Sequence, residues 1–376
     1  MQPVLEKREN IVIGGGVAGA AAAIWLTKQG RNVLLLEKEA APRHKVCGEF
    51  ISIEAQHYLK ELGIDLMALG AVPIRQFRLI KGSREINTRL PFLALSLSRY
   101  VLDEALLQLA ISTGVELRRG TNVTSLVPNN PGWMISSPTC ELQGERVFLA
   151  TGKHDLRGWP RDDAGSESHI GLKMHYILSP AQQRELAGHI EVMVFQGGYA
   201  GLVPIENGKA NLCLVIRKSV FLRHGRDWGQ LLSDLSATIP RLKARLQDAT
   251  PCWERPLAIA GIPYGYIHPA EGNDQFGLFP IGDQMAVIPS FCGDGIAIAL
   301  HTAFLATAIN TSDYIITAQH ELQLQMRRAS QVARIMAGSL TCELAFLTCR
   351  VRPSLLATLI TKTRVLYSGL YAAKPF

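Results

Sequence analysis

The chain has 376 residues, of which 47% are hydrophobic and 19% charged, and its formal net charge is +7. A chain of this length and composition is expected to fold into about two globular domains, and disordered or fibrous proteins are excluded. The basic residues are scattered without a DNA- or RNA-binding motif, and the seven cysteines form no Cys-x-x-Cys pair, so neither a nucleic-acid partner nor a metal site is expected.

The first predicted element is a β-α-β unit over residues 11–38, which read IVIGGGVAGAAAAIWLTKQGRNVLLLEK. An apolar strand meets a Gly-x-Gly-x-x-Gly turn, a helix follows, and a second strand ends at an acid about 20 residues later, as in dinucleotide-binding proteins. Gly14 permits the tight turn, Gly16 lets the backbone approach a pyrophosphate, and Gly19 lets the helix pack closely. Glu37 is expected to accept hydrogen bonds from a ribose. This unit predicts dinucleotide binding without deciding between NAD and FAD.

A basic loop follows at residues 38–50, KEAAPRHKVCGEF. A fingerprint followed by an acid and then by P-R-x-K-x-C-G resembles the geranylgeranyl reductase branch of the flavoprotein monooxygenase superfamily. The resemblance implies that Lys45, Cys47 and Gly48 lie beside the flavin ring. Cys47 is then a candidate for direct chemistry, although a small buried residue without chemistry explains it equally simply. Glu49 departs from the branch, since many reductases have a second glycine there.

A helix is predicted to begin after Ser98, which is a favourable N-cap residue. The sequence S-R-x-x-L-D-x-x-L resembles a superfamily helix whose arginine approaches the cofactor pyrophosphate, so Arg99 is the candidate here. The alternative for Arg99 is an ion pair with Asp103, one turn further along. A later strand ends in Ala-Thr-Gly at residues 150–152, as in two-domain FAD proteins. The Asp-Gly that follows in aromatic hydroxylases is absent, so the strand does not indicate where a nicotinamide binds.

Residues 166–255 contain alternating apolar runs separated by Gly-Gly and Asn-Gly turns, which predicts an antiparallel sheet forming the wall of a substrate cavity. The stretch GYAGLVP at residues 198–204 resembles the Y-x-W-x-F-P strand of the reductase branch. Ala200 and Gly201 are small where that strand is bulky, and Tyr199 is a candidate proton donor. The Trp-rich segment and the lysine of flavin halogenases are not found, so halogenation is not expected.

A second strong motif covers residues 277–300, where an apolar strand delivers Gly-Asp, a proline-bearing loop follows, and Gly-x-Gly opens a helix. This order resembles the Gly-Asp and P-x-x-x-G-x-G elements of the superfamily. Asp283 is expected to bind a ribityl hydroxyl, and the helix start at residues 293–296 is expected to stabilise negative charge on the flavin. Together with the N-terminal fingerprint, this motif favours FAD over NAD.

These elements predict a mixed α/β fold with a Rossmann-like FAD-binding domain of three-layer ββα architecture, an inserted antiparallel β domain for the substrate, and a helical C-terminus. The FAD-binding domain is expected over residues 1–75, 97–165 and 256–325. The substrate domain is expected over 76–96 and 166–255, and the helical region over 326–376. The expected cofactor-binding residues are Gly14, Gly16, Ala18, Gly19, Glu37, Lys38, Lys45, Cys47, Gly48, Arg99, Val123, Gly152, Asp283, Pro289, Gly293, Gly295 and Ile296, and the expected catalytic residues are Cys47 and Tyr199.

The resemblance implies an FAD-dependent oxidoreductase that is reduced by NADPH or NADH and acts on a bulky, largely apolar small molecule. We favour monooxygenation of an apolar or aromatic secondary metabolite, because the bulky residues of the reductase strand are missing. Two alternatives stay open. One is reduction of a C=C bond in a geranylgeranyl-type lipid, with Cys47 or Tyr199 as proton donor, and the other is a flavin-binding protein without redox turnover.

The location expected from the sequence is the cytoplasm, because the first residues lack a signal-peptide core and no apolar run approaches the roughly 20 residues that span a bilayer. Residues 354–371 are apolar and flanked by basic residues. This stretch is expected to pack on the core as a helix. The sharper alternative is a basic amphipathic helix that rests on a membrane.

Overall fold

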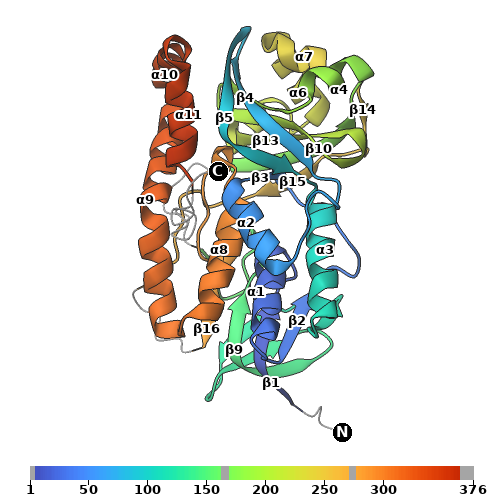
Figure 1. The fold of residues 1–376 in the computed structure, drawn as a ribbon, viewed down its shortest axis with the longest axis vertical. Helices are drawn as coiled ribbons and strands as arrows, with labels where there is room; N and C mark the ends of the chain where they lie inside the picture. Colours follow the sequence, from blue (N-terminus) through green and yellow to red (C-terminus); the bar gives the residue numbers. More distant parts are fainter. Residues whose placement is uncertain (1–4, 162–168, 271–276, 365–376) are drawn as a thin grey trace.

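The computed structural model describes residues 5–161, 169–270 and 277–364. Two sheets lie one above the other, with helices α1, α3 and α8 beside the lower sheet and a column of C-terminal helices along one side (Figure 1). The parts of the predicted domain ranges at 1–4, 162–168, 271–276 and 365–376 lie outside the described residues. The outer end of the expected C-terminal apolar helix lies there too.

The lower sheet, sheet A, has the strand order β6-β2-β1-β9-β8-β7 within the described chain, and β16 pairs with β9. Strands β6, β2, β1, β9 and β16 are parallel, and β7 and β8 continue from β9 as an antiparallel meander. The bounds are β1 (Glu6–Ile13), β2 (Val33–Glu37), β6 (Glu116–Arg119), β7 (Ser125–Pro128), β8 (Trp133–Ser136), β9 (Glu141–Leu149) and β16 (Leu278–Pro280).

The centre of sheet A, at residues 11–13, 33–36 and 147–149, is buried on both faces, which explains why these segments are continuous apolar runs. One face, with Val12, Leu35 and Phe148, packs against helices in the largest core cluster. The other face, with Ile11 and Leu36, packs against side chains of the meander. The helices of this domain are α1 (Val17–Lys28), α2 (Ile53–Leu62), α3 (Arg99–Ser112) and α8 (Gly295–Ala308). Helices, sheet and meander form the three predicted layers.

The upper sheet, sheet B, has the order β14-β10-β13-β12-β11-β4-β5-β3 among the described residues, with β15 on β10. Its pairs are antiparallel except for β11 and β4, which are parallel. The bounds are β3 (Phe50–Ile51), β4 (Val72–Lys81), β5 (Arg84–Ser96), β10 (His169–Ile177), β11 (His189–Phe195), β12 (Gly198–Pro204), β13 (Lys209–Arg217), β14 (Thr250–Pro251) and β15 (Leu257–Ala260). The chain therefore enters sheet B twice, first over β3–β5 and again over β10–β15.

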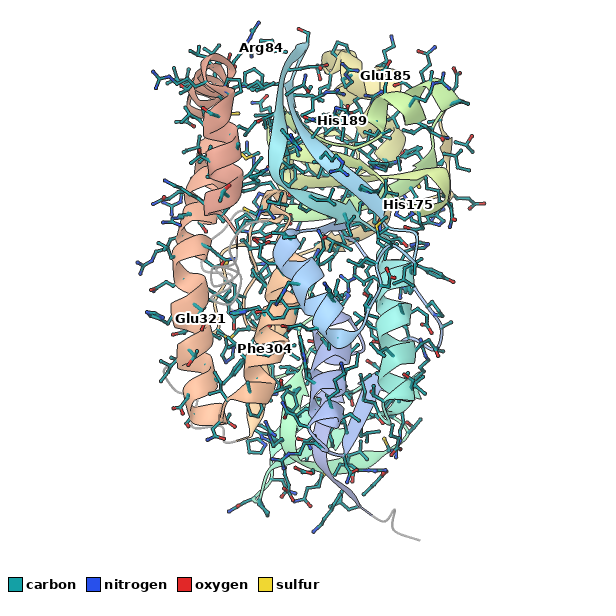
Figure 2. The ribbon with its side chains drawn as sticks, in the orientation of Figure 1. Arg84, His175, Glu185, His189, Phe304 and Glu321 are labelled. Carbon is teal, nitrogen blue, oxygen red and sulfur yellow. The ribbon has the colours of Figure 1, made fainter. Side chains whose placement is uncertain are left out.

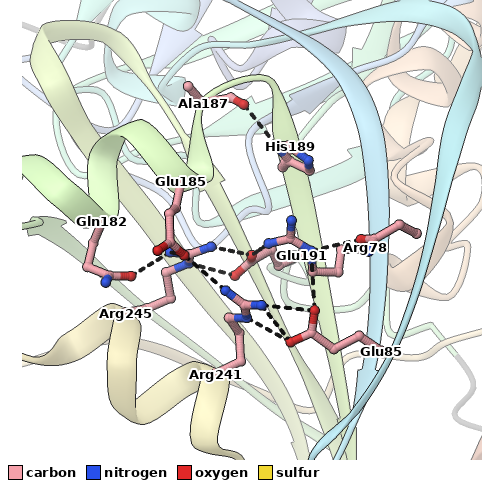
Figure 3. Close-up of polar contacts among 10 residues, drawn as sticks. Arg78, Glu85, Gln182, Glu185, Ala187, His189, Glu191, Arg241 and Arg245 are labelled. Atoms are coloured by element: carbon pink, nitrogen blue, oxygen red, sulfur yellow. Dashed lines mark hydrogen bonds and ion pairs between the residues drawn. The ribbon is translucent and has the colours of Figure 1, made fainter.

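The outer face of sheet B is covered by short helices: α4 (Pro180–Leu186), α5 (Lys218–Arg223), α6 (Trp228–Thr238) and α7 (Pro240–Leu246). Helices α6 and α7 are separate because Pro240 starts a new helix. A buried ion-pair network ties α7 to the sheet (Figure 3). Glu191 on β11 accepts from Arg245 at 2.8 Å and also pairs with Arg78 on β4.

The C-terminal helices form an arm beside both sheets (Figure 1). Its members are α9 (Thr311–Ala337), α10 (Ser339–Val351) and α11 (Pro353–Lys362). No helix within the described ranges is both long and apolar enough to cross a bilayer. Helices α9 and α10 reach the required length and composition only as a pair, and they are bent by 107° at their junction.

Candidate functional site

The glycine-rich turn between β1 and α1 has the backbone that the fingerprint predicts. Gly14 has φ +108°, and a β-carbon there would lie 2.4 Å from the Ala150 carbonyl oxygen. A β-carbon at Gly19 would lie 1.9 Å from the Gly14 carbonyl oxygen, so only glycine fits. The Gly15 N–H donates to Glu37 Oε2 at 2.6 Å, and this bond fixes the acid at the end of β2.

Two cations face the start of α1 across this turn. A β-carbon at Gly16 would lie 3.5 Å from Arg99 Nη2 and 3.6 Å from Lys45 Nζ. Asp103 holds both cations, through Arg99 Nε at 2.6 Å and Lys45 Nζ at 2.9 Å. Burial opposes the ionisation of Asp103, but the two cations lower its pKa below the usual range. Arg99 therefore forms the expected ion pair with Asp103 and also approaches the glycine turn.

This arrangement fits a pyrophosphate. The first turn of α1, all of it described, has no acidic side chain and no side-chain cap at Gly16, so its backbone N–H groups are available to an anion. Arg99 and Lys45 add two positively charged donors beside the turn, and Asp103 and Glu37 bring two carboxylates to the same place. A pocket opens beside the turn, lined by Gly15, Glu37, Glu39, Ala41, Pro42, Arg43, Lys45, Tyr100, Asp103, Glu104, Leu107 and Arg119. Its position beyond Glu37 suits the adenosine end of a dinucleotide.

The loop with Lys45, Cys47 and Gly48 is held against sheet B by donors to three successive carbonyl oxygens. Lys173 Nζ donates to the carbonyl of Lys45 at 3.0 Å, and Lys153 Nζ to that of Val46 at 2.9 Å. Asn211 Nδ2 donates to the carbonyl of Cys47 at 3.0 Å. The loop is therefore positioned jointly by both parts of the molecule.

Glu49, the residue that departs from the reductase pattern, is the buried anchor of this loop. Its φ is +57°, and its side chain has no exposure. It pairs with Lys173, which is equally buried, accepts from the Arg99 N–H at 2.9 Å, and lies 2.7 Å from His175 Nε2. Burial opposes its ionisation, but Lys173 and His175 lower its pKa below the usual range. Figure 2 labels His175 where the two sheets meet.

Sequence reasoning missed Glu49, Lys173 and His175 as a group. The available signal was Lys173 and His175 two positions apart in an otherwise apolar strand, which puts them on one face. His44, Glu49 and His175 have ligating atoms within 4.8 Å of one another. Lys173 already supplies the charge that balances Glu49, so we assign this cluster to holding the loop and not to a metal.

The second motif, residues 277–300, contacts the first helix and the end of the 45–50 loop. A β-carbon at Gly282 would lie 3.0 Å from Ala18 Cβ, so the turn with Asp283 packs on the first helix. A β-carbon at Gly293 would lie 2.9 Å from the Phe50 ring. Pro289, Gly293, Gly295 and Ile296 thus lie at the start of α8 beside the 45–50 loop. Two motifs far apart in sequence share one site.

Tyr199 lies in a chain of three hydroxyl groups next to that helix start. Tyr199 donates to Ser290 Oγ at 2.7 Å, and the Tyr264 hydroxyl lies 2.6 Å from the same oxygen. Burial raises the pKa of both phenols, so both stay protonated at neutral pH. Burial also raises the pKa of the neighbouring Cys213 thiol to about 12. Tyr264 and Ser290 were not predicted, because they lie in irregular loops.

The remaining predicted residues are Cys47, Gly152, Lys38 and Val123. The Cys47 thiol accepts from the Glu49 N–H at 3.4 Å and lies beside the Arg99 guanidinium. Gly152 adopts φ +66°, and its carbonyl accepts from Gln284 Nε2 at 2.8 Å. Lys38 is exposed, and Val123 is buried in the meander layer. Neither Lys38 nor Val123 lines the pocket beside the glycine turn.

Comparison with known proteins finds several that are described as FAD- or flavin-dependent. A family model described as an FAD dependent oxidoreductase matches residues 10–67. The menaquinone reductase of Mycolicibacterium smegmatis is 24% identical, over 89% of this chain and 85% of that protein. The flavin-dependent halogenase armH5 of Armillaria mellea is 33% identical, over 81% of this chain and 64% of that protein.

Solved structures agree on the fold. The flavin-dependent brominase Bmp2 has a TM-score of 0.79 at 18% identity, covering 96% of this chain and 95% of that one. The structure of pqsL, a probable FAD-dependent monooxygenase from Pseudomonas aeruginosa, has a TM-score of 0.71 at 16% identity, covering 91% of this chain and 100% of that one. At these identities the likeness establishes the fold alone. It confirms the predicted Rossmann-like flavoprotein architecture.

Proposed function

We propose that this chain, which belongs to the superfamily of FAD-dependent oxidoreductases, is a monooxygenase of a bulky, largely apolar substrate with an aromatic ring. The observation that carries the proposal is the hydroxyl chain Tyr199–Ser290–Tyr264 beside the start of α8. A ring that bears a hydroxyl or carbonyl group can exchange hydrogen bonds with such a chain. A purely isoprenoid chain cannot. Tyr199 and Tyr264 are half-buried and Ser290 is exposed, so this chain of hydroxyl groups is open to a substrate that hydrogen-bonds with it.

FAD would be held at its phosphates by Lys45, Arg99 and the N-terminus of α1, and at its ribose by Glu37. Bound there, the flavin supplies two-electron chemistry, either as hydride transfer or as activation of dioxygen. We propose NADPH or NADH as the electron donor.

The chain's own residues bind and orient. Gly201 follows Tyr199 by two positions on β12, so both residues face the same side of sheet B. A β-carbon at Gly201 would meet only the Cys213 carbonyl oxygen, at 3.8 Å, which leaves room beside the phenol for a ring. The protonated phenols can donate hydrogen bonds to Ser290 Oγ or to a substrate oxygen. The 45–49 loop is fixed in position by Lys173 and Asn211.

A second candidate is reduction of a C=C bond. It is favoured by the alignment with menaquinone reductase, which extends over most of both chains. The same hydroxyl chain would then deliver the proton that accompanies a hydride.

Product mass separates these reactions. Purified FAD-loaded protein is supplied with NADPH or NADH and ¹⁸O₂, together with hydroxylated aromatic compounds and prenylated quinones as separate substrate sets. We expect a ring product that carries one ¹⁸O atom and forms only with oxygen. A product heavier by two hydrogens, formed equally well without oxygen, would select the reductase. A halogenated product in the presence of bromide or chloride would overturn both.

The hydroxyl chain is tested by Tyr199→Phe and Tyr264→Phe. Each is expected to lower kcat by about 100-fold, the usual scale for a positioned proton-transfer group. The matched control is Tyr176→Phe, because Tyr176 packs in the core on the outer face of sheet B and should leave kcat unchanged. Unchanged turnover in both site variants would contradict the proposed role.

A further inference from the structure

The outer face of α10 is an exposed apolar stripe. Its members Leu340, Leu344, Leu347 and Val351 are 81%, 65%, 41% and 81% exposed. Their spacing of four, three and four residues puts them on one side of the helix, over roughly 17 Å of its length. The opposite side, with Cys342, Phe346 and Cys349, is buried against the protein. Helix α10 is thus apolar on both sides, although only one side has a partner in the described structure.

The stripe continues onto α11. Leu355 and Leu359 lie one turn apart there and are 38% and 39% exposed. Isolated exposed leucines are common on protein surfaces, but a contiguous apolar strip on adjacent helices indicates an interaction surface.

The charges around the stripe are positive. Arg350, Arg352 and Lys362 are exposed at its border. The single acid between residues 339 and 364 is Glu343, and it is neutralised by Lys81 at 2.8 Å and Arg84 at 2.9 Å. Arg84 is labelled beside the arm in Figure 2. A surface with an apolar centre and an unopposed basic border matches the interface of an anionic bilayer.

The arm that carries the stripe also reaches the candidate site. Arg364, just past α11, binds Asp294 at 2.5 Å, and Asp294 is the residue directly before α8. The Arg364 guanidinium also lies over the rings of Phe50 and Phe92. The C-terminal end of α11 therefore lies close to the start of α8.

We propose that the α10–α11 stripe docks this protein on the surface of an anionic lipid membrane. The proposal does not depend on the reaction class, because binding to vesicles is measured without turnover. It differs from the expectation drawn from the sequence by locating the contact mainly on α10, before Pro353.

Cosedimentation with vesicles tests it. The full-length FAD-loaded protein is mixed with phosphatidylcholine vesicles that contain phosphatidylglycerol, and with pure phosphatidylcholine vesicles. We expect binding to the anionic vesicles that weakens with added salt. The variant Leu340→Ser/Leu344→Ser/Val351→Ser should weaken this binding by about tenfold or more. Arg350→Gln/Arg352→Gln should remove the preference for phosphatidylglycerol.

The matched control is Met67→Ser/Ile177→Ser/Ile316→Ser, which removes three apolar side chains that are 58%, 50% and 62% exposed elsewhere. It should bind vesicles as the unmodified protein does, and both triple variants should keep their melting temperature. Equal loss in the control, or no vesicle binding at all, would overturn the proposal. Sedimentation velocity without lipid tests whether a second copy of the chain covers the stripe instead of a membrane. A dimer that the stripe variant converts to a monomer would also overturn the proposal.

Discussion

At the scale of single residues, the least expected feature is a charged cluster in the deepest part of the site. Glu49 and Lys173 are both fully buried, and they pair across 124 positions of sequence. The sequence motif identified the loop but read Glu49 only as a departure from a family pattern. Its partners lie on a strand from the other sheet, and no local pattern of residues encodes such a distant pairing.

Replacing Glu49 with Gln is expected to lower the free energy of unfolding by about 3–5 kcal/mol, because Lys173 loses its partner inside the protein. The control is Glu9→Gln, which removes a surface pair with Arg31 whose side chains are 35% and 52% exposed. It should cost about 1 kcal/mol or less. Urea unfolding of the two variants measures both values. Similar losses in the two variants would contradict the assigned role of Glu49.

At the scale of elements, the glycine turn and the start of α8 were predictable because each is determined by residues that are close together in sequence. A turn that excludes a β-carbon at Gly14 and at Gly19 leaves a Gly signature, and a strand, turn and helix follow one another directly in sequence. The parallel pairing of β11 with β4 was not predictable, because β-strand pairing between distant segments depends on how the layers pack. Tyr264 and Ser290 escaped prediction for a related reason, since loops carry no periodicity.

Two glycines of the turn are expected to respond differently to alanine. Gly16→Ala should leave the apo-protein stable, because its β-carbon meets only the flexible tips of Arg99 and Lys45, yet it should weaken FAD binding at least tenfold by occupying phosphate space. Gly19→Ala should destabilise the fold by about 1–3 kcal/mol or more, because its β-carbon would overlap the Gly14 carbonyl. Flavin fluorescence titration and urea unfolding separate the effects. Equal destabilisation of both apo-proteins would contradict this division.

At the scale of the whole molecule, stability is expected to depend on pH through two half-buried histidines. Burial lowers the pKa of His268 to about 4, and burial together with the His175 and Lys173 charges lowers that of His44 to about 4. The unfolded chain therefore binds more protons than the folded protein between about pH 4 and 6.5. Stability is complete above about pH 6.5 and falls as the pH drops toward 4.

Urea unfolding at pH 7, 6 and 5 checks this prediction. The slope contributed by each histidine should approach about 1.4 kcal/mol per pH unit within that window. His268→Gln should remove one such contribution, and the double variant with His44→Gln should flatten the profile further. If the slope of the free energy of unfolding against pH is unchanged in His268→Gln, other titratable groups control the loss of stability at low pH.

The three carbonyl oxygens held by Lys153, Lys173 and Asn211 have a consequence for how such a protein diversifies. The adenosine end of the site is built within sheet A, whereas the geometry of the 45–49 loop is set by side chains that sheet B largely supplies. A substitution that slides β10 or β13 relative to sheet A is expected to move this loop, Lys45 included, while Glu37 and the glycine turn keep their positions. Substrate selectivity can thus change through substitutions in sheet B with little loss of cofactor binding.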